Sequence, residues 1–239
     1  LLTVNYTGRI ADNVVLERIA AEKGLLLAED ASQSFGATLE GRPSGSFGDI
    51  SAMSHNPMKV LAATGEAGSI TLDDARVVDR VRQLRYNGTV DKETCVTPSL
   101  NGRMDTVQAA ALLVRLRRHA AVINARRANA HYYDDNLADF VTVPPRDGLH
   151  DDVFYTYTIR SSRRDELYEH LQKLGIETKI QHPLLMPQHP AYHGSKGEWS
   201  HAASLVKQVL CIPIHEKLTL DQRERVAEGI ISFGPSSPE

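Results

Sequence analysis

The chain has 239 residues, enough for one large domain or two modest domains with a proper buried core. Its hydrophobic content of 41% and charged content of 24% are ordinary for a globular protein. The formal net charge of -3 gives no electrostatic reason to expect binding to nucleic acid or to an anionic membrane surface. No apolar run approaches the length of about 20 residues that spans a bilayer. The two cysteines, Cys95 and Cys211, do not imply a disulfide framework, so we expect a reduced, cytoplasmic setting.

The start of the chain predicts a β-α-β unit. Residues 1–4 have a strand pattern, residues 13–23 have helical spacing and end before a glycine, and residues 25–28 are an apolar run typical of a strand covered on both faces. This order implies a parallel, right-handed crossover, and ligands gather at the carboxyl ends of such strands. Glu29 and Asp30 fall at such an end. The first residues lack the basic leader and apolar core of a signal peptide, and we expect the chain to begin inside a larger fold.

A glycine-rich loop and a lysine follow the acidic pair. The loop covers residues 41–48, and residues 50–54 form the next expected strand. Lys59 comes after that strand and a proline turn, and extended structure is expected again at 68–72. Residues 73–85 predict a helix whose acidic start and basic end match the helix dipole.

The second half of the chain predicts a long helix and then a smaller α/β region. Residues 104–137 contain no Gly or Pro and have helical apolar spacing, so we expect one helix that connects two domains or packs across a subunit interface. Residues 1–103 would then belong to a large domain and residues 138–239 to a smaller C-terminal α/β domain. Strands are expected at 153–159 and 176–181, helices at 164–174, 200–210 and 220–231, and irregular segments at 86–102, 194–199 and 234–239.

Lys59 and Asp30 are the residues that suggest chemistry. A lysine desolvated among a buried strand and small residues has a lowered pKa and can form a Schiff base with an aldehyde cofactor. Pyridoxal phosphate needs a carboxylate against its ring nitrogen to keep that nitrogen protonated, and Asp30 suits this role. Ser54, at a strand end, suits donation to a phosphate. Each residue also has an ordinary interpretation, as a solvated loop lysine, a helix N-cap and a plain strand-end serine.

Three segments together resemble the cofactor motifs of a known family. They read EDASQSFGA at 29–37, GSFGDISAMSHNPMK at 45–59 and GEAGSI at 65–70. The likeness continues through LRYNG, LNGRMDTVQAA, IQHPLLMPQHPAY and CIPIHEKLTLDQRERV, and so covers nearly the whole chain. The chain resembles the DegT-type (DegT/DnrJ/StrS) sugar aminotransferases. These are fold-type I pyridoxal phosphate enzymes, with an aspartate aminotransferase-like α/β fold whose large domain contains a mainly parallel sheet.

The resemblance implies a role for individual residues. Lys59 would carry the Schiff base to pyridoxal 5'-phosphate and would move the substrate proton as general acid and base. Asp30 would pair with the pyridinium nitrogen, and Gln33 would lie near the ring hydroxyl. Ser54 would hold the phosphate. Asn101 would extend across a homodimer interface and bind the cofactor phosphate in the site of the neighbouring subunit.

The resemblance also implies a reaction. Such an enzyme moves an amino group from an amino acid, usually glutamate, to a keto sugar carried on a nucleotide, in the biosynthesis of amino sugars for surface polysaccharides or antibiotics. The sugar, the aminated carbon and the pathway stay open. His182 would contact this substrate. We prefer that role to a zinc site, because the histidines at 182, 189, 193 and 201 lack the close pairing of zinc ligands.

The chain departs from the family pattern in three places. His55 and Asn56 stand where an aromatic residue usually follows the phosphate serine, and residues 65–68 read Gly-Glu-Ala-Gly instead of Gly-Glu-Gly-Gly. Lys59 argues against a related dehydratase branch that has histidine at that position. Family members also carry a long segment before the position of Leu1, which supplies a Gly-Thr phosphate loop and an aromatic ring that stacks on the cofactor. The alternative function is therefore a truncated, non-catalytic scaffold or regulatory relic of the same family.

Overall fold

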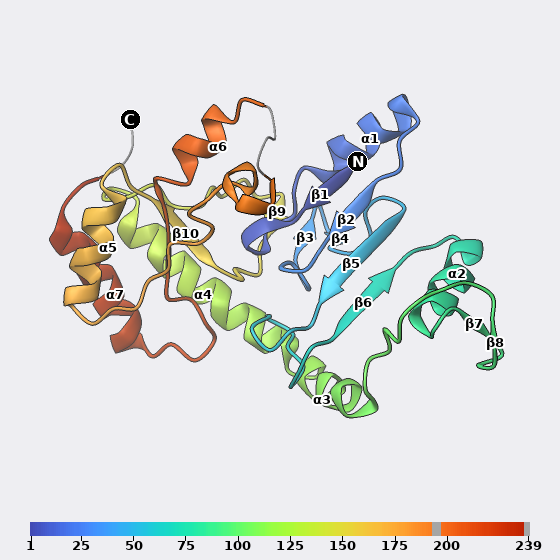
Figure 1. Cartoon of the computed structure of the whole chain (residues 1–239). Coiled ribbons are helices and arrows are strands. Elements are labelled where there is room, and N and C mark those ends of the chain that lie inside the picture. The colour runs from blue at the N-terminus through green and yellow to red at the C-terminus, as the bar shows by residue number, and fades with distance from the viewer. Residues whose placement is uncertain (193–196, 237–239) are drawn as a thin grey trace. The chain divides into compact units, whose positions relative to one another are not determined.

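The computed structural model describes residues 1–192 and 197–236, and the chain forms two compact units (Figure 1). The first unit comprises residues 1–123 and 148–155. The second comprises residues 124–147 and the chain from residue 156 onward. In the described part of the chain, no helix is long and apolar enough to cross a lipid bilayer.

A four-stranded sheet forms the centre of the first unit. Its order is β1 (Leu2–Val4), β2 (Ala28–Asp30), β5 (Ile50–Ser54) and β6 (Gly68–Thr71). Strands β1, β2 and β5 are parallel, and β6 is antiparallel to β5. Helix α1 (Asn13–Lys23) connects β1 to β2. The expected parallel β-α-β unit and the mainly parallel sheet are therefore confirmed.

The second strand lies later in the chain than the apolar run at 25–28 predicted. The two leucines that open this run are 49% and 76% exposed, and only Leu27 is buried. Leu27 is held by Asp49, whose carboxylate accepts a hydrogen bond from the Leu27 amide at 2.8 Å. The leucines of this run therefore form an irregular segment before the strand, with one buried side chain, and not a strand that is buried on both faces. The shift places Glu29 and Asp30 inside β2, where successive side chains point to opposite faces.

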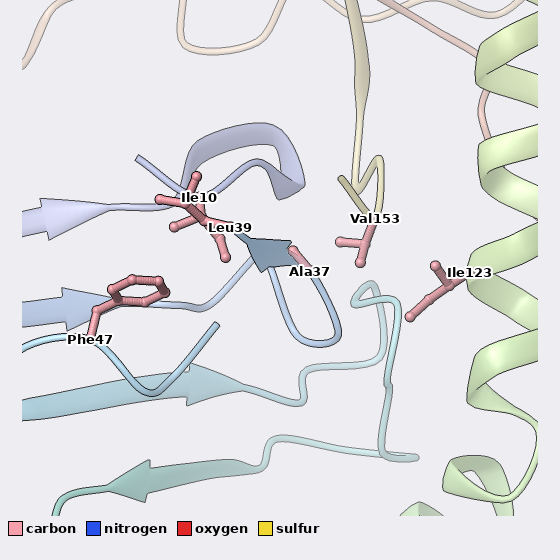
Figure 2. Close-up of a cluster of buried hydrophobic side chains, with 6 residues drawn as sticks. All are labelled: Ile10, Ala37, Leu39, Phe47, Ile123 and Val153. Atoms are coloured by element: carbon pink, nitrogen blue, oxygen red, sulfur yellow. The ribbon is translucent and has the colours of Figure 1, made fainter. Parts of the chain in front are cut away.

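A cluster of buried apolar side chains joins distant segments of the first unit (Figure 2). Its members are Ile10, Ala37, Leu39, Phe47, Ile123 and Val153. A small sheet of order β4 (Arg42–Pro43), β3 (Thr38–Leu39) and β9 (His150–Asp151) lies within these segments. Full burial of a large apolar side chain contributes about 1.5–3 kcal/mol, so the cluster is a strong reason why residues 148–155 return to the first unit.

Residues 104–137 form two helices, α3 (Thr106–Leu116) and α4 (His119–Leu137), and the expectation of a single helix is wrong. Tertiary contacts hold the adjoining ends of the helices to different segments. The Arg115 guanidinium donates to two backbone carbonyls of the loop after β5, at 2.5 and 3.0 Å. The ring of His119 bonds to a backbone carbonyl after β2 at 3.2 Å. The division between the two compact units falls inside α4, between residues 123 and 124.

The remaining elements of the first unit are short. They are the 3-10 turn η1 (Tyr6–Gly8), helix α2 (Ala75–Arg85) and the hairpin of β7 (Thr89–Val90) and β8 (Thr94–Cys95). Asp74 is the N-cap of α2, and its side chain accepts a hydrogen bond from the backbone amide of Arg76 at 2.9 Å. The helix expected at 73–85 is thus confirmed, and it begins at Ala75, directly after the capping residue.

The second unit contains an antiparallel pair of strands, β10 (Tyr157–Arg160) and β11 (Val209–Ile212). Helices α5 (Arg164–Lys173) and α7 (Leu220–Phe233) pack together in this unit. The other helical segments are η2 (Met186–Gln188), η3 (Pro190–Tyr192) and α6 (Ser200–Leu205).

The strand arrangement of the second unit differs from the expected one. Within residues 176–181, Lys179 forms an isolated bridge with Cys211 instead of a strand. The helix expected over 200–210 ends at Leu205, because the apolar run Val209–Ile212 is buried as a strand beside β10. The expected loop residues 194–196 and tail residues 237–239 lie outside the described part of the chain.

Candidate functional site

One face of the four-stranded sheet carries Asp30 and Ser54, two of the residues expected to bind the cofactor. Strands β2 and β5 pair with Asp30 opposite Ala52, and side chains alternate along each strand. Asp30, Ala52 and Ser54 therefore share one face, on which Ala52 is exposed. Glu29 and Ser51 are buried on the opposite face. The register thus separates the acidic pair, and only Asp30 remains on the open face.

Asp30 ends β2 and supports a turn instead of capping a helix. Its Oδ1 accepts a hydrogen bond from the Ser32 amide at 2.9 Å. Gln33, on the same turn, accepts a hydrogen bond from the Thr7 amide through its Oε1 at 2.8 Å. Thr7 has a φ of 62°, a left-handed conformation that is uncommon for a threonine, and the Gln33 contact holds it. The ordinary interpretation of Asp30 as a helix N-cap is not what the structure shows.

Lys59 lies in the loop 55–67 between β5 and β6, and its side chain is partly buried. Its Nζ lies 4.5 Å from the centroid of the Tyr155 ring. Burial lowers the pKa of Lys59, and the negative charge of Asp30 acts on the same pKa in the opposite direction. The charges of Asp30 and Lys59 are therefore coupled electrostatically. Burial and the aromatic contact exclude the interpretation of Lys59 as a fully solvated loop lysine.

Ser54 is the last residue of β5 and lies between the other two residues along the chain. Its Oγ accepts a hydrogen bond from the Asn56 amide at 3.3 Å, at the point where the loop of Lys59 begins. Because β2 and β5 are parallel, Ser54 and Asp30 end their strands at the same edge. The sequence-predicted residues Asp30, Ser54 and Lys59 thus belong to one edge of one sheet.

Asn101 follows the β7–β8 hairpin of the first unit, and His182 belongs to the second unit. Asn101 is exposed, pairs with Tyr86 in an isolated bridge, and accepts a hydrogen bond from Arg103 Nε at 3.2 Å. His182 is exposed, has a φ of 50°, and belongs to the second unit. Within the first unit, the contacts of Asn101 are with Tyr86 and Arg103.

Tyr155 is a site residue that the sequence did not indicate. It follows β9 and comes to Lys59 because residues 148–155 return to the first unit. A ring face near an ammonium group is favourable by about 0.5–2 kcal/mol, depending on how far the pair is removed from water. No motif or periodicity marks Tyr155, since its position depends on packing between segments that are far apart in sequence.

The buried carboxylate of Glu29 has a structural role on the other face of the sheet. It accepts hydrogen bonds from Asn5 Nδ2 at 2.6 Å, from the Gly45 amide at 3.0 Å and from the Phe47 amide at 3.2 Å. These amides belong to the glycine-rich loop 41–48. Glu29 therefore fixes that loop against β2, and a carboxylate that accepts several such bonds is tolerated in the interior.

The described residues, 1–192 and 197–236, include no group of three or more His, Cys, Asp or Glu side chains arranged to hold a metal ion. One of the histidines considered for zinc, His193, lies outside these ranges. The Cys211 thiol contacts the Thr158 hydroxyl and the Gln181 amide oxygen, both at 3.3 Å. Burial raises the pKa of Cys211, which favours the unreactive thiol form.

The chain matches known proteins over most of its length. Residues 1–231 match the sequence profile of the DegT/DnrJ/EryC1/StrS aminotransferase family. A curated relative, the dTDP-3-amino-3,4,6-trideoxy-alpha-D-glucose transaminase of Streptomyces venezuelae, is 36% identical over 240 aligned positions, which cover 96% of this chain and 62% of the relative.

Solved structures agree with this match. The crystal structure of a DegT DnrJ EryC1 StrS aminotransferase from Brucella abortus superposes with a TM-score of 0.94 and 30% identity, over 98% of this chain and 64% of that one. The structure of ntda from Bacillus subtilis with bound cofactor PMP superposes with a TM-score of 0.86 and 26% identity, over 97% of this chain and 55% of that one. The expected fold-type I α/β architecture is confirmed, and the chain spans less than two thirds of the length of these relatives.

Proposed function

The chain belongs to the DegT/DnrJ/EryC1/StrS aminotransferase family, and from this premise we propose that it acts as a pyridoxal 5'-phosphate-dependent sugar aminotransferase with Lys59 as its cofactor-binding lysine. The observation that carries the proposal is the partly buried Lys59 amine, 4.5 Å from the Tyr155 ring centroid and within electrostatic reach of Asp30. The donor would be an amino acid, with glutamate as the first choice. The acceptor would be a keto sugar carried on a nucleotide, and the product an amino sugar.

The side chains around Lys59 have the chemistry that this cofactor requires. When bound, pyridoxal phosphate supplies an aldehyde that bonds to amines and a cationic ring that withdraws electrons from the substrate. Lys59 offers an amine whose pKa burial lowers, so that more of it is in the nucleophilic neutral form near neutral pH. Asp30 offers a carboxylate on the same sheet face, and Ser54 offers a hydroxyl that can donate to a phosphate oxygen.

Lys59 is also the proposed acid and base of the reaction. A neutral Nζ can take the proton from the substrate carbon that bears the amino group, and the ammonium can return it. An acid-base catalyst works best when its pKa lies near the working pH. Burial and the Asp30 charge act on the pKa of Lys59 in opposite directions, with burial the stronger, and the balance moves it downward from the value of a free lysine.

The other predicted site residues and the partners complete the proposal. Asn101, exposed and held through its Oδ1 by Arg103, would serve the phosphate of a neighbouring copy in a homodimer, with its amide nitrogen as the donor. Gln33 would lie near the cofactor ring, and His182 would contact the sugar nucleotide. A reduced, cytoplasmic setting is also proposed, since both cysteines are unpaired.

The proposal is tested by adding pyridoxal phosphate to the purified chain and following the absorbance band of the lysine-bound cofactor. We expect the band in the wild-type chain and in Lys23→Ala, because Lys23 is an exposed lysine of α1. We expect no such band in Lys59→Ala. A folded wild-type chain that gives no band would support the non-catalytic scaffold instead.

A second measurement separates an aminotransferase from another enzyme of the same fold. Glutamate is added to the cofactor-loaded chain without a sugar, and 2-oxoglutarate is measured. An aminotransferase releases about one equivalent of 2-oxoglutarate per site, since the amino group stays on the cofactor. Cofactor capture without any 2-oxoglutarate from glutamate or other amino acids would contradict the transfer reaction while leaving Lys59 as the cofactor lysine.

A further inference from the structure

His55 is a buried histidine that connects the two sides of the Lys59 loop. It follows Ser54 directly, and its side chain is closed off from water. Its Nδ1 lies 3.3 Å from the carbonyl oxygen of Leu61, beyond Lys59 in the loop. Its Nε2 lies 2.9 Å from the Oγ of Ser69, on β6 after the loop has returned. One imidazole therefore bonds both the middle and the far end of the segment that carries Lys59.

The hydrogen bonds fix the form of this ring. A carbonyl oxygen only accepts hydrogen bonds, so Nδ1 carries the proton and donates to Leu61. In the neutral ring Nε2 then accepts from the Ser69 hydroxyl, which can rotate to donate. Burial lowers the pKa of His55, so the neutral ring that satisfies both bonds is favoured. His55 is therefore a cross-link with a defined tautomer and not a proton carrier.

The same ring also contacts the segment that carries Asp30 and Gln33. Phe35 lies edge-on to His55, with ring centroids 5.6 Å apart, and edge-on to His119, with centroids 5.2 Å apart. The backbone of His55 adds two hydrogen bonds within the loop, from Ala63 and to the carbonyl of Ala67, at 2.7 and 2.8 Å. His55 thus touches both segments that position the two charged groups of the site.

We propose that His55 is a positioning residue that holds the Lys59 loop closed, and that it thereby keeps the Lys59 amine partly out of water and near Asp30. This role deepens the proposed function and rests on it for the chemistry of Lys59. The positioning role is supported by the contacts of the His55 ring with Leu61, Ser69 and Phe35. When the ring bonds are lost, the loop loosens and the amine becomes hydrated.

The test measures the protonation of Lys59 without any cofactor. The chain is acylated briefly with N-hydroxysuccinimidyl acetate across a pH range, and the labelling of Lys59 is read by peptide mass spectrometry. The rate at pH 8 is divided by the rate on the high-pH plateau, so that differences in access cancel. In His55→Phe, which keeps a ring but loses both bonds, we expect this ratio to fall by about three-fold or more, because a hydrated amine is more fully protonated at pH 8.

The chain offers a matched control in its second unit. His170 Nε2 bonds to the Gly229 carbonyl and the Ser232 hydroxyl, both at 3.1 Å, and its ring contacts Phe233 at a centroid distance of 5.5 Å. His170→Phe removes the same kinds of bond, and we expect it to leave the Lys59 ratio unchanged. A fall of the same size in His170→Phe would overturn the proposal, since it would report only a general loss of stability.

A milder variant keeps the proposal testable if His55→Phe does not fold. Ser69→Ala removes the partner of Nε2 alone, and we expect a smaller fall of the Lys59 ratio in the same direction. An unchanged ratio in folded Ser69→Ala and in folded His55→Phe would overturn the positioning role. A chain that fails to capture pyridoxal phosphate, but whose ratio falls in these variants, would refute the proposed function and leave the positioning role supported.

Discussion

The buried carboxylate of Glu29 gives a stability prediction that follows directly from its hydrogen bonds. The substitution Glu29→Gln keeps the size of the side chain and replaces one carboxylate oxygen by an NH2 group. In the wild-type chain the two oxygens accept from Asn5 Nδ2 at 2.6 Å, from the Gly45 amide at 3.0 Å and from the Phe47 amide at 3.2 Å. Whichever way the new amide is oriented, at least one of these buried donors then faces a donor.

These contacts set the size of the loss in the free energy of unfolding. A buried donor that loses its acceptor costs about 1–3 kcal/mol, and the remaining bonds lose the strengthening that a charged acceptor gives. Removal of the buried charge offsets part of this loss, because the carboxylate no longer has to be desolvated. We therefore expect Glu29→Gln to lower the free energy of unfolding of the first unit by about 2–3 kcal/mol.

The assay is urea unfolding, combined with hydrogen exchange of the Gly45 and Phe47 amides, which Glu29 holds. Glu22→Gln is the control, since Glu22 is an exposed residue of α1 and a surface substitution usually changes stability by no more than about 0.5 kcal/mol. We expect faster exchange at both amides in Glu29→Gln only. Unchanged exchange and an unchanged urea midpoint would refute the role of Glu29 in holding the glycine-rich loop.

Three further predictions concern the site and the caps. The substitution Asp30→Asn removes the negative charge that raises the pKa of Lys59, so the pH midpoint of Lys59 acylation should move to lower pH. A midpoint that stays in place or rises would contradict the coupling between these two residues. A Cβ added at Gly8, where φ is +96°, would lie 2.6 Å from the Tyr155 amide nitrogen. Gly8→Ala should therefore lower the free energy of unfolding in urea by about 1–3 kcal/mol and weaken cofactor binding. Wild-type values for both measurements would contradict this packing. Thr219 caps α7 through its side chain, and Thr219→Ala should cost about 0.5–2 kcal/mol, seen as a lower thermal midpoint, whereas Thr219→Ser should retain most of the stability.

The local signals in the sequence predicted the sheet edge at which Asp30 and Ser54 lie. The order of apolar runs and helical spacing gave the parallel β-α-β unit, because these elements depend on short-range periodicity. Asp30 and Ser54 end two parallel strands of one sheet and Lys59 follows the second of them, and such strand ends meet at a common edge. The predicted position of β2 was less accurate, since apolarity alone does not distinguish a buried strand from an irregular segment before the strand with one buried leucine.

The sequence patterns did not predict the features that depend on long-range packing. The break between α3 and α4 arises from contacts of Arg115 and His119 with distant backbone carbonyls, which override an uninterrupted helical pattern. Tyr155 reaches Lys59 for a similar reason, through the return of residues 148–155 to the first unit. His55 was visible as a departure from the family pattern, but its cross-link to Leu61 and Ser69 could not be read from spacing.

The central claim is that the amine of Lys59 takes pyridoxal phosphate. The most direct measurement is reduction of the cofactor-treated chain with borohydride, followed by digestion and peptide mass spectrometry. We expect the pyridoxyl mass on the peptide that contains Lys59, and we expect pretreatment of the chain with an acylating reagent at that amine to prevent the labelling. The same mass spread over exposed lysines such as Lys23, with none on Lys59, would show that Lys59 is not the cofactor lysine.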